Sequence, residues 1–230
     1  MTTTPRERAR ERTLAEITRI GREHLATHGA AALSLRAVAR DLGVVSSAVY
    51  RYVASRDDLL TLLVVDAYDE LGAEVDAALE GLPADDHRGR LHALARAVRG
   101  WAVRETARYA LLFGSPVPGY HAPAERTTGP GTRVVVALVG IVEDAYRAGA
   151  LTPAESPVGP VLSADLDRIR ADMGLTVPGP VLANGVAAWA ALFGAVNFEV
   201  FGQYGPDTFT DPAMLFEHQL TVLDRIVGLG

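Results

Sequence analysis

The chain has 230 residues, of which 49% are hydrophobic, and it carries a formal net charge of −6. A chain of this length can bury the core of one large domain or two small ones. It contains no cysteine, which excludes disulfide bonds and thiolate metal sites and fits a reducing cytoplasm. The acidic total argues against a protein that coats nucleic acid with its whole surface.

Charge is distributed unevenly along the chain. Residues 1–56 carry ten arginines and five acidic residues, whereas residues 57–230 carry 12 basic and 23 acidic residues. A basic N-terminal module on an acidic body is expected of a protein that binds DNA at one local site. All basic residues are arginine, which we attribute to a GC-rich genome and not to phosphate binding.

The first residues, 1–10, are charged and lack the apolar core of a signal peptide. We expect a disordered arm, which either follows the DNA backbone or minor groove or remains a solvated tail. A first helix is predicted over residues 10–28 and ends at Gly29. His24 and His28 are spaced to chelate a metal, but no carboxylate motif accompanies them, so we expect surface histidines and no metal site.

Residues 34–56 have the pattern of a short helix, a tight turn and a second short helix. Ser34 is a favourable N-cap, Ser46 or Ser47 would cap the second helix, and Gly43 suits a turn through positive φ. Each helix has one apolar face at helical spacing, formed by Leu35, Val38, Ala39 and Leu42 in the first and by Val49 and Val53 in the second. This spacing is typical of a helix-turn-helix.

The second of these helices would present the side chains that read DNA. Serine and arginine can hydrogen-bond base edges, and alanine or valine can contact a thymine methyl group. Tyrosine hydroxyls and Arg56 suit phosphate oxygens. We therefore expect DNA contacts from Ser34, Arg36, Val45, Ser46, Ser47, Ala48, Tyr50, Arg51, Tyr52 and Arg56. The alternative is an ordinary helical hairpin with solvated polar residues. For Tyr50 and Tyr52 a separate alternative is that they are partly buried aromatics with a solvated hydroxyl group.

Six further helical segments follow. A helix from Ser55 would be capped by the Ser55–Asp58 box and end near Leu79. A helical block is predicted over 86–113, a Pro/Gly-rich loop over 114–131, and a helix from Thr132 that is apolar almost all round and must be deeply buried. The remaining predicted helices are a short one from Ser163 to Met173 and two long ones over 181–204 and 212–229.

Aromatic residues in this second part are candidates for a ligand pocket, because such pockets are mostly apolar with a few orienting polar groups. Tyr120 lies in the Pro/Gly-rich loop, and a long loop in a compact domain is usually functional or mobile. The expected pocket residues are Trp101, Arg104, Tyr109, Phe113, Tyr120, Trp189 and Phe193. The alternative, that these aromatics simply fill the core, remains open residue by residue.

The stretch from Met173 to Phe198 carries no charge and is long enough to span a membrane. Asn184, Asn197 and the Pro/Gly-rich entry argue instead for a helix buried on both sides in a helical domain. We expect no membrane role, with one side of this helix facing the core and another meeting a second copy of the chain.

Residues 9–70 resemble the DNA-binding domain of the TetR family of transcriptional regulators. The resemblance rests on His28-Gly29, residues 34–39, Leu42-Gly43-Val44, residues 48–53 and residues 55–60, with mild departures at Val53 and Arg56. A weaker resemblance to one C-terminal subgroup covers 189–204 and 211–229. The family resemblance implies a homodimeric, all-helical regulator, predominantly a repressor, whose last two long helices form a four-helix bundle with their symmetry mates.

The sequence therefore predicts an all-α protein with a helix-turn-helix domain over 1–56, including the arm 1–10, and an effector-binding and dimerisation domain over 57–230. Its expected partners are palindromic double-stranded DNA, an unknown small-molecule effector and a second copy, contacted through the helices near 181–204 and 212–229. No cofactor or catalytic residue is expected, because phosphate-loop, Gly-x-Ser-x-Gly and His-Glu-x-x-His motifs are missing. The alternatives are a helical ligand-binding protein or enzyme with an incidental hairpin, and a non-specific nucleoid-type DNA binder.

Overall fold

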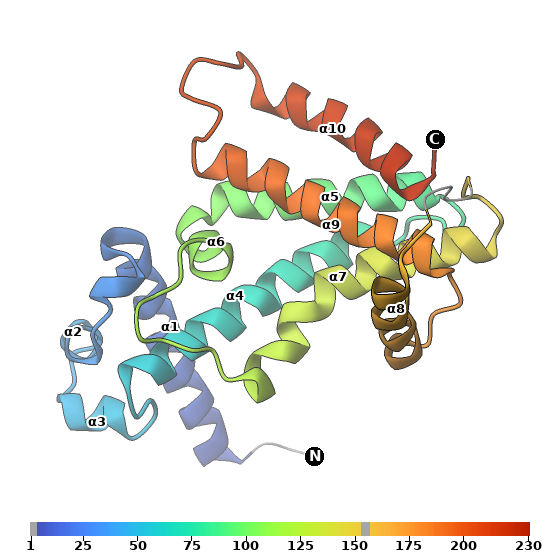
Figure 1. The fold of residues 1–230 in the computed structure, drawn as a ribbon. Coiled ribbons are helices and arrows are strands. Elements are labelled where there is room, and N and C mark those ends of the chain that lie inside the picture. The colour runs from blue at the N-terminus through green and yellow to red at the C-terminus, as the bar shows by residue number, and fades with distance from the viewer. Residues whose placement is uncertain (1–3, 153–156) are drawn as a thin grey trace. The chain divides into compact units, whose positions relative to one another are not determined.

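The structure is a computed structural model that describes residues 4–152 and 157–230. Within these ranges the chain forms helices joined by loops, without a strand, which confirms the predicted all-α class (Figure 1). The chain divides into two compact units. The first unit comprises Met1–Gly72 and Arg104–Thr132, and the second comprises Ala73–Val103 and Arg133–Gly230.

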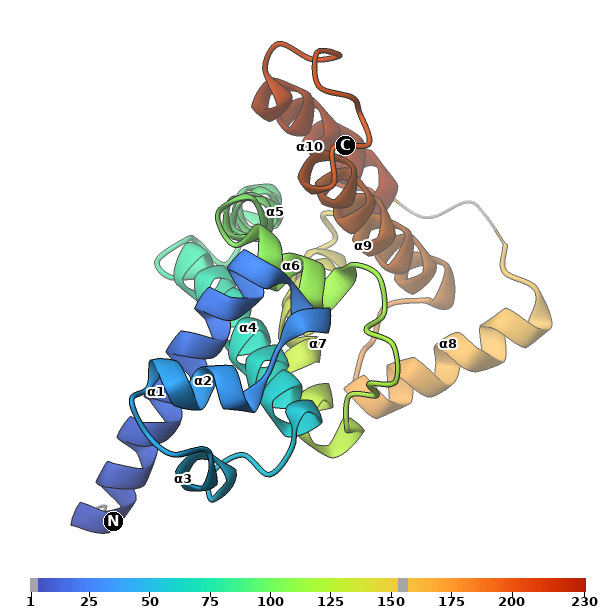
Figure 2. The ribbon, with the colours of Figure 1, turned by 90° about the vertical axis from the view of Figure 1, so that its left-hand side faces the viewer.

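The first unit contains the N-terminal helices together with a segment from later in the chain. Its elements are α1 (Pro5–His28), the 3₁₀ turn η1 (Ala30–Ala32), α2 (Leu35–Asp41), α3 (Ser46–Tyr50), the first part of α4 (Arg56–Leu79), α6 (Thr106–Phe113) and the start of α7 (Ala124–Arg147). Figure 2 shows α2 and α3 beside α1. Helices α1 and α4 approach closely at Gly21, where an added Cβ would lie 3.2 Å from Leu63 Cδ2.

The core of this unit is built from the apolar faces that the sequence pattern indicates. Burial of aliphatic side chains at roughly 25 cal/mol per Å² is what holds such short helices in place, since helices of five or seven residues are unstable alone. The buried residues are Ile17, Ile20, Leu25, Leu33, Leu35, Val38, Ala39, Val49, Val53, Leu59, Leu60 and Leu63.

The N-terminus differs from the prediction of a disordered arm over 1–10. Helix α1 begins at Pro5, and residues 1–3 lie outside the described residues. Thr4 and Glu7 form a capping box, in which the Glu7 N–H donates to Thr4 Oγ1 at 3.2 Å and the Thr4 N–H donates to Glu7 Oε2 at 2.7 Å. Pro5 suits the first helical position because its missing N–H has no helical partner there anyway.

The second unit contains three whole helices, α8 (Pro160–Met173), α9 (Gly179–Val200) and α10 (Pro212–Val227). It also contains the end of α4, most of α7, and all of α5 (His87–Arg104) except Arg104. Helices α9 and α10 run side by side in both ribbon views (Figures 1 and 2). Helix α5 is joined to this pair by ion pairs. Arg99 binds Glu199 of α9 at 2.6 Å, and Arg96 binds Glu217 of α10 at 2.6 Å.

Several predicted boundaries are corrected. The block 86–113 is divided at Glu105 into α5 and α6. Helix α7 begins at Ala124, inside the segment predicted as loop, and includes Pro130, although proline removes one helical hydrogen bond. The predicted start at Ser163 moves to Pro160 of α8, because Pro160 suits the first helical turn.

The prediction that α7 is deeply buried all round is wrong within this chain, because Val136 is 50% exposed. Helix α9 was expected to meet a second copy on one side, and Trp189 on this helix is 39% exposed within the single chain. Helix α9 is long and apolar enough to cross a membrane by length and composition alone, but one third of that stretch is buried in the protein and the helix packs along α10.

Candidate nucleic-acid interface and ligand cavity

The turn between α2 and α3 sets the geometry of the candidate nucleic-acid interface. Gly43 has φ 72°, a conformation that only glycine adopts without a Cβ clash. The Gly43 N–H donates to the Arg40 carbonyl and the Val44 N–H to the Ala39 carbonyl, both at 3.0 Å, which closes the end of α2 as a Schellman motif. Val49 is 1% exposed and fixes α3 on the core, which leaves Ser47 and Tyr50 of this helix exposed.

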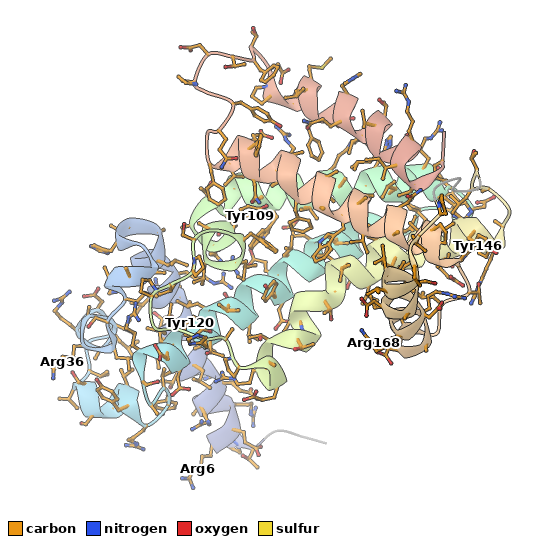
Figure 3. The ribbon with its side chains drawn as sticks, in the orientation of Figure 1. Arg6, Arg36, Tyr109, Tyr120, Tyr146 and Arg168 are labelled. Carbon is orange, nitrogen blue, oxygen red and sulfur yellow. The ribbon has the colours of Figure 1, made fainter. Side chains whose placement is uncertain are left out.

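The structure divides the ten predicted DNA-contacting residues into two groups. Val45 is 71% exposed at the start of α3. Figure 3 shows Arg36 at the periphery of the first unit. The exposed residues are Arg36, Val45, Ser47, Tyr50 and Arg51, and the half-buried ones are Ser34, Ser46, Ala48, Tyr52 and Arg56.

The predicted serine caps are not formed. Ser34 occupies the N-cap of α2, but its side chain makes no capping hydrogen bond. The N-cap of α3 is Val45, which has no capping side chain, so neither Ser46 nor Ser47 caps this helix. The only predicted cap of this region that forms is at α4, where Ser55 Oγ accepts from the Asp58 N–H at 3.0 Å. Packing of Val49 and Val53, and not capping, therefore holds α3.

Arg56 has partners that sequence reasoning did not predict. Its Nη2 donates to the carbonyl oxygens of Ala30 and Ala31, at 3.0 and 3.2 Å. These hydrogen bonds tie the start of α4 to the 3₁₀ turn after α1. The expected contact between Arg56 and a phosphate group stays a prediction. One nitrogen of this guanidinium already donates hydrogen bonds within the protein.

A polar cleft between the start of α1 and the end of α3 contains arginines that the sequence prediction left out. Its volume is about 420 Å³, and it is lined by Thr4, Arg6, Glu7, Ala9, Arg10, Arg51 and Tyr52. The guanidinium carbon of Arg10 lies 5.5 Å from the centre of the Tyr52 ring, which is cation–π distance. The Thr4-x-x-Glu7 capping box was the sequence signal that places these arginines on a helix.

A network of ion pairs lies behind this interface and joins α1, α4 and α6. Asp66 accepts hydrogen bonds from Arg22 at 2.6 and 2.7 Å and from Arg108 at 3.0 Å. Arg108 also donates to Glu70 at 2.7 Å. The network thus includes an arginine of the first helix of the helix-turn-helix domain and an arginine of α6.

A cavity of about 320 Å³ lies in the same unit, between α4, α6, the 114–123 loop and the start of α7. Tyr120 and Thr61 place their hydroxyl oxygens 3.0 Å apart at its edge. Burial raises the pKa of Tyr68, with the neighbouring Tyr120 as a second cause. The lining residues are Val64, Tyr68, Leu111, Leu112, Tyr120, Ala122, Thr127, Thr128, Gly131 and Thr132.

Of the seven predicted pocket residues, only Tyr120 lines this cavity. Phe113 supports it indirectly, because its ring meets the Tyr68 ring edge-on at 6.1 Å. Tyr109 is fully buried in the first unit, as is Trp101 in the second, and Arg104 is exposed. Trp189 and Phe193 lie in the second unit, 6.2 Å apart and edge-to-face on α9. Sequence reasoning missed Tyr68, Thr127, Thr128 and Gly131.

The second unit has a groove of about 280 Å³ between α9 and α10. Small residues leave it open, since a Cβ added at Gly194 would meet no atom within 4 Å. The groove is lined by Ala191, Leu192, Gly194, Ala195, Phe198, Tyr204, Phe216, Gln219, Val222 and Leu223. Exposed apolar side chains on the two helices include Val186, Phe198, Met214 and Val222.

The two histidines spaced for metal binding have another arrangement. His24 Nε2 lies 2.6 Å from Asp41 Oδ2, and the His24 and His28 rings pack edge-on at 5.8 Å. Across residues 4–152 and 157–230, no group of three or more histidine, aspartate or glutamate side chains is arranged to hold a metal ion.

Three N-terminal helices with an outward-facing α3, together with a larger helical part, define a helix-turn-helix DNA-binding protein. Residues 17–63 match the family model described as bacterial regulatory proteins, tetR family, and residues 91–223 match that of the tetracyclin repressor-like C-terminal domain. The chain belongs to the TetR family of transcriptional regulators.

Known proteins agree with this assignment. The HTH-type transcriptional regulators Rv1816 of Mycobacterium tuberculosis and Mb1846 of Mycobacterium bovis are each 49% identical to the chain over 223 residues, which is 97% of this chain and 95% of theirs. The crystal structure of SCO4313 is 35% identical, with a TM-score of 0.77 and coverage of 96% of this chain and 98% of that one. A Rhodococcus protein of unknown function, 20% identical, shares the fold with a TM-score of 0.71 over 94% of this chain and 95% of its own.

Proposed function

We propose that this regulator is a homodimeric repressor, which binds a palindromic operator and leaves it when a small-molecule effector binds. The observation that carries the proposal is the double role of Tyr120, which lines a cavity and also packs against the helix-turn-helix core. A ligand in that cavity would touch a residue that packs against the core shared by α1 to α4. We place DNA binding in residues 1–56, effector binding and dimerisation in residues 57–230, and the protein's action in the cytoplasm.

The proposed DNA contacts use α3 in the major groove. Exposed Ser47, Tyr50 and Val45 would meet base edges and a thymine methyl group, while Arg36 would contact the backbone. We add Arg6 and Arg10 to the predicted set, because the cleft that they form with Arg51 would face a phosphate group beside the groove. Two recognition helices of a dimer would fit half-sites about 10 base pairs apart or somewhat more.

The proposed dimer interface is the outer face of α9 and α10. Phe198, Met214 and Val222 are exposed on these two helices. Phe198 and Val222 line the groove together with the small residues Ala191, Gly194 and Ala195, which would let helices of two subunits approach closely. Apolar side chains that remain exposed on two long adjacent helices indicate a surface that another protein covers. A second copy is the partner that the family resemblance implies.

The proposed control operates through α4. Its residue Thr61 bonds to Tyr120, and its residues Leu59 and Leu60 belong to the helix-turn-helix core. An effector changes DNA affinity only if it binds one conformation more tightly than the other. We propose that the effector-bound conformation moves α4 relative to α2 and α3 and so weakens operator binding.

The proposal is tested by fluorescence anisotropy of the protein on duplex DNA from its own upstream region and on an unrelated duplex, across a salt series. Specific binding, with log K falling by about 0.9 per log unit of salt for each phosphate neutralised, is expected. Ser47→Tyr should abolish operator binding without changing the oligomeric state. Equal affinity for both duplexes would favour the nucleoid-type alternative, and failure to bind either would favour a helical ligand-binding protein.

A further inference from the structure

We infer that the effector is an uncharged, mainly apolar molecule with one hydrogen-bond donor, and that it binds in the cavity of about 320 Å³ in the first unit. This inference rests on the proposed effector control and adds to it the site and the chemical class of the ligand. Figure 3 shows Tyr120 next to the start of α4, and both Tyr120 and Ala122 of the 114–123 loop line the cavity.

The cavity has apolar walls and offers a ligand no counter-ion. Val64, Leu111 and Leu112 supply aliphatic surface, and the polar side chains of the lining are the hydroxyl groups of threonine and tyrosine. A charged ligand would lose its hydration here without gaining an ion pair, which makes binding unfavourable. Arg108, which precedes the lining residue Leu112 by four residues on α6, is itself paired with Asp66 and Glu70.

The hydrogen-bond pattern at the edge of the cavity indicates which polar group the ligand carries. Thr61 donates its single hydroxyl proton to the Asp57 carbonyl at 2.9 Å. Its oxygen therefore accepts the Tyr120 hydroxyl proton across their 3.0 Å separation. The remaining lone pair of Tyr120 can accept a hydrogen bond, so a ligand hydroxyl or N–H group matches this position.

Gly131 makes room for Tyr68, the second tyrosine that lines the cavity. A Cβ at this position would lie 3.3 Å from the Tyr68 ring, so glycine permits Tyr68 to extend along α7 into the cavity. Burial keeps Tyr68 protonated at neutral pH, because it raises the pKa of a phenol whose ordinary value is already near 10. Tyr68 is thus a neutral hydroxyl group in the wall of the cavity.

The matched probes are 2-naphthol, which is uncharged at pH 7, and 2-naphthoate, which has the same rings and a negative charge. Titration of the full-length protein, followed by the fluorescence of each probe, should show that 2-naphthol binds at least ten times more tightly. Equal or tighter binding of 2-naphthoate, or no binding of 2-naphthol up to its solubility limit, would overturn the inference.

Two leucine substitutions in the same helix locate the bound probe. Gly131→Leu fills the cavity and should weaken 2-naphthol binding at least tenfold, whereas Gly129→Leu, at an exposed position with open space around it, should leave it unchanged. Gly131→Ala adds only the Cβ and should weaken binding to a smaller degree, which keeps the test valid if the leucine variant does not fold. Unchanged binding in both Gly131 variants would place the probe elsewhere.

The two proposals fail in different ways. Selective binding of 2-naphthol that does not alter operator affinity would contradict effector control through this cavity but leave its ligand chemistry intact. Loss of the preference for the neutral probe would contradict the ligand chemistry whatever the DNA affinity does. Anisotropy on labelled operator, with and without 2-naphthol, distinguishes these results.

Discussion

Arg108 of α6 donates a 3.0 Å hydrogen bond to Asp66 of α4, and only 4% of the Arg108 side chain is exposed. The same carboxylate binds Arg22 of α1, so one acidic residue holds two arginines from two other helices. Removing one member of such a network leaves its partners desolvated and without that ion pair. The resulting loss in free energy of unfolding is larger than the loss caused by breaking an exposed ion pair.

We expect Arg108→Met to lower the free energy of unfolding by about 3 kcal/mol, because Asp66 and Glu70 would lose a buried partner. Urea denaturation of the full chain measures this loss. The matched control is Arg168→Met, which removes a well-exposed arginine paired with Asp165 on α8 and should change stability far less. Equal losses in the two variants would show that the Arg108 network contributes no more to stability than an exposed ion pair.

Glu143 of α7 should make stability depend on pH. Burial acts to raise its pKa, but hydrogen bonds from Thr176 and Val177 and the nearby Arg147 guanidinium outweigh burial and hold the pKa below its ordinary range. A pKa lower in the folded than in the unfolded state stabilises the protein above the unfolded value. This contribution is lost as the pH falls through the folded value.

Glu143→Gln should therefore reduce the free energy of unfolding at pH 7 by about 1–3 kcal/mol, the cost of weakening a buried hydrogen-bonded carboxylate. The difference from the wild type should begin to shrink as the pH falls below the unfolded pKa, because the unfolded wild-type carboxyl is protonated first, and it should disappear once the folded carboxyl is protonated as well. Urea titrations at several pH values provide the measurement. A difference that stayed constant down to pH 3 would mean that the charge of Glu143 plays no part.

The arginine cleft should contribute to DNA affinity without contributing to sequence specificity. Arg10→Ala is expected to weaken binding similarly on operator and unrelated duplexes and to reduce the salt slope by about one unit. Anisotropy titrations at several salt concentrations give the slope. Arg225→Ala on α10 removes the same charge from the second unit and should leave the slope unchanged.

Arg56→Ala should behave differently from Arg10→Ala. Loss of the phosphate contact predicted from the sequence would again reduce the salt slope by about one unit. Because Arg56 also binds the carbonyl groups of Ala30 and Ala31, this variant should in addition lose about 1 kcal/mol of stability or more. Denaturation and anisotropy of the same preparation separate the two effects, and unchanged stability would show that these hydrogen bonds are dispensable.

A charged side chain introduced into the α9–α10 groove should be compatible with the folded monomer but not with the proposed dimer. Ala191→Glu introduces a carboxylate at an exposed position of the groove, so the subunit should fold normally while the dimer dissociates. Sedimentation velocity measures the oligomeric state and circular dichroism the helix content. Ala164→Glu, on exposed α8, is the matched control and should remain dimeric. A dimeric Ala191→Glu variant would place the interface elsewhere.

The helix-turn-helix domain could be predicted because its signals are local. The apolar faces of α2 and α3 and the turn at Gly43 are separated by few residues, and the structure places Val38, Ala39 and Val49 in the core as expected. The start of α1 was also readable, since Thr4 and Glu7 form a capping box, but the charged composition of the first ten residues suggested disorder instead.

The cavity could not be predicted from composition. Tyr109 and Tyr120 lie eleven residues apart in a similarly aromatic stretch, yet one is fully buried in the core and the other lines the cavity. Tyr68 meets Gly131 only because α4 and α7 pack together, and no local pattern connects residues so far apart in the chain. The partners of Arg56 were missed for the same reason, since Ala30 and Ala31 lie on a turn more than twenty residues earlier.

The position of Tyr120 has a consequence for how ligands of this protein should be sought. Tyr120 lines the cavity and packs against the helix-turn-helix core. Under the effector control that we propose, ligand binding and DNA binding are thermodynamically reciprocal, so each changes the affinity of the other by the same factor. A compound that acts as an effector would then bind the free protein and the DNA complex with different affinities. The ratio of the two affinities for a compound would itself measure how strongly it acts as an inducer.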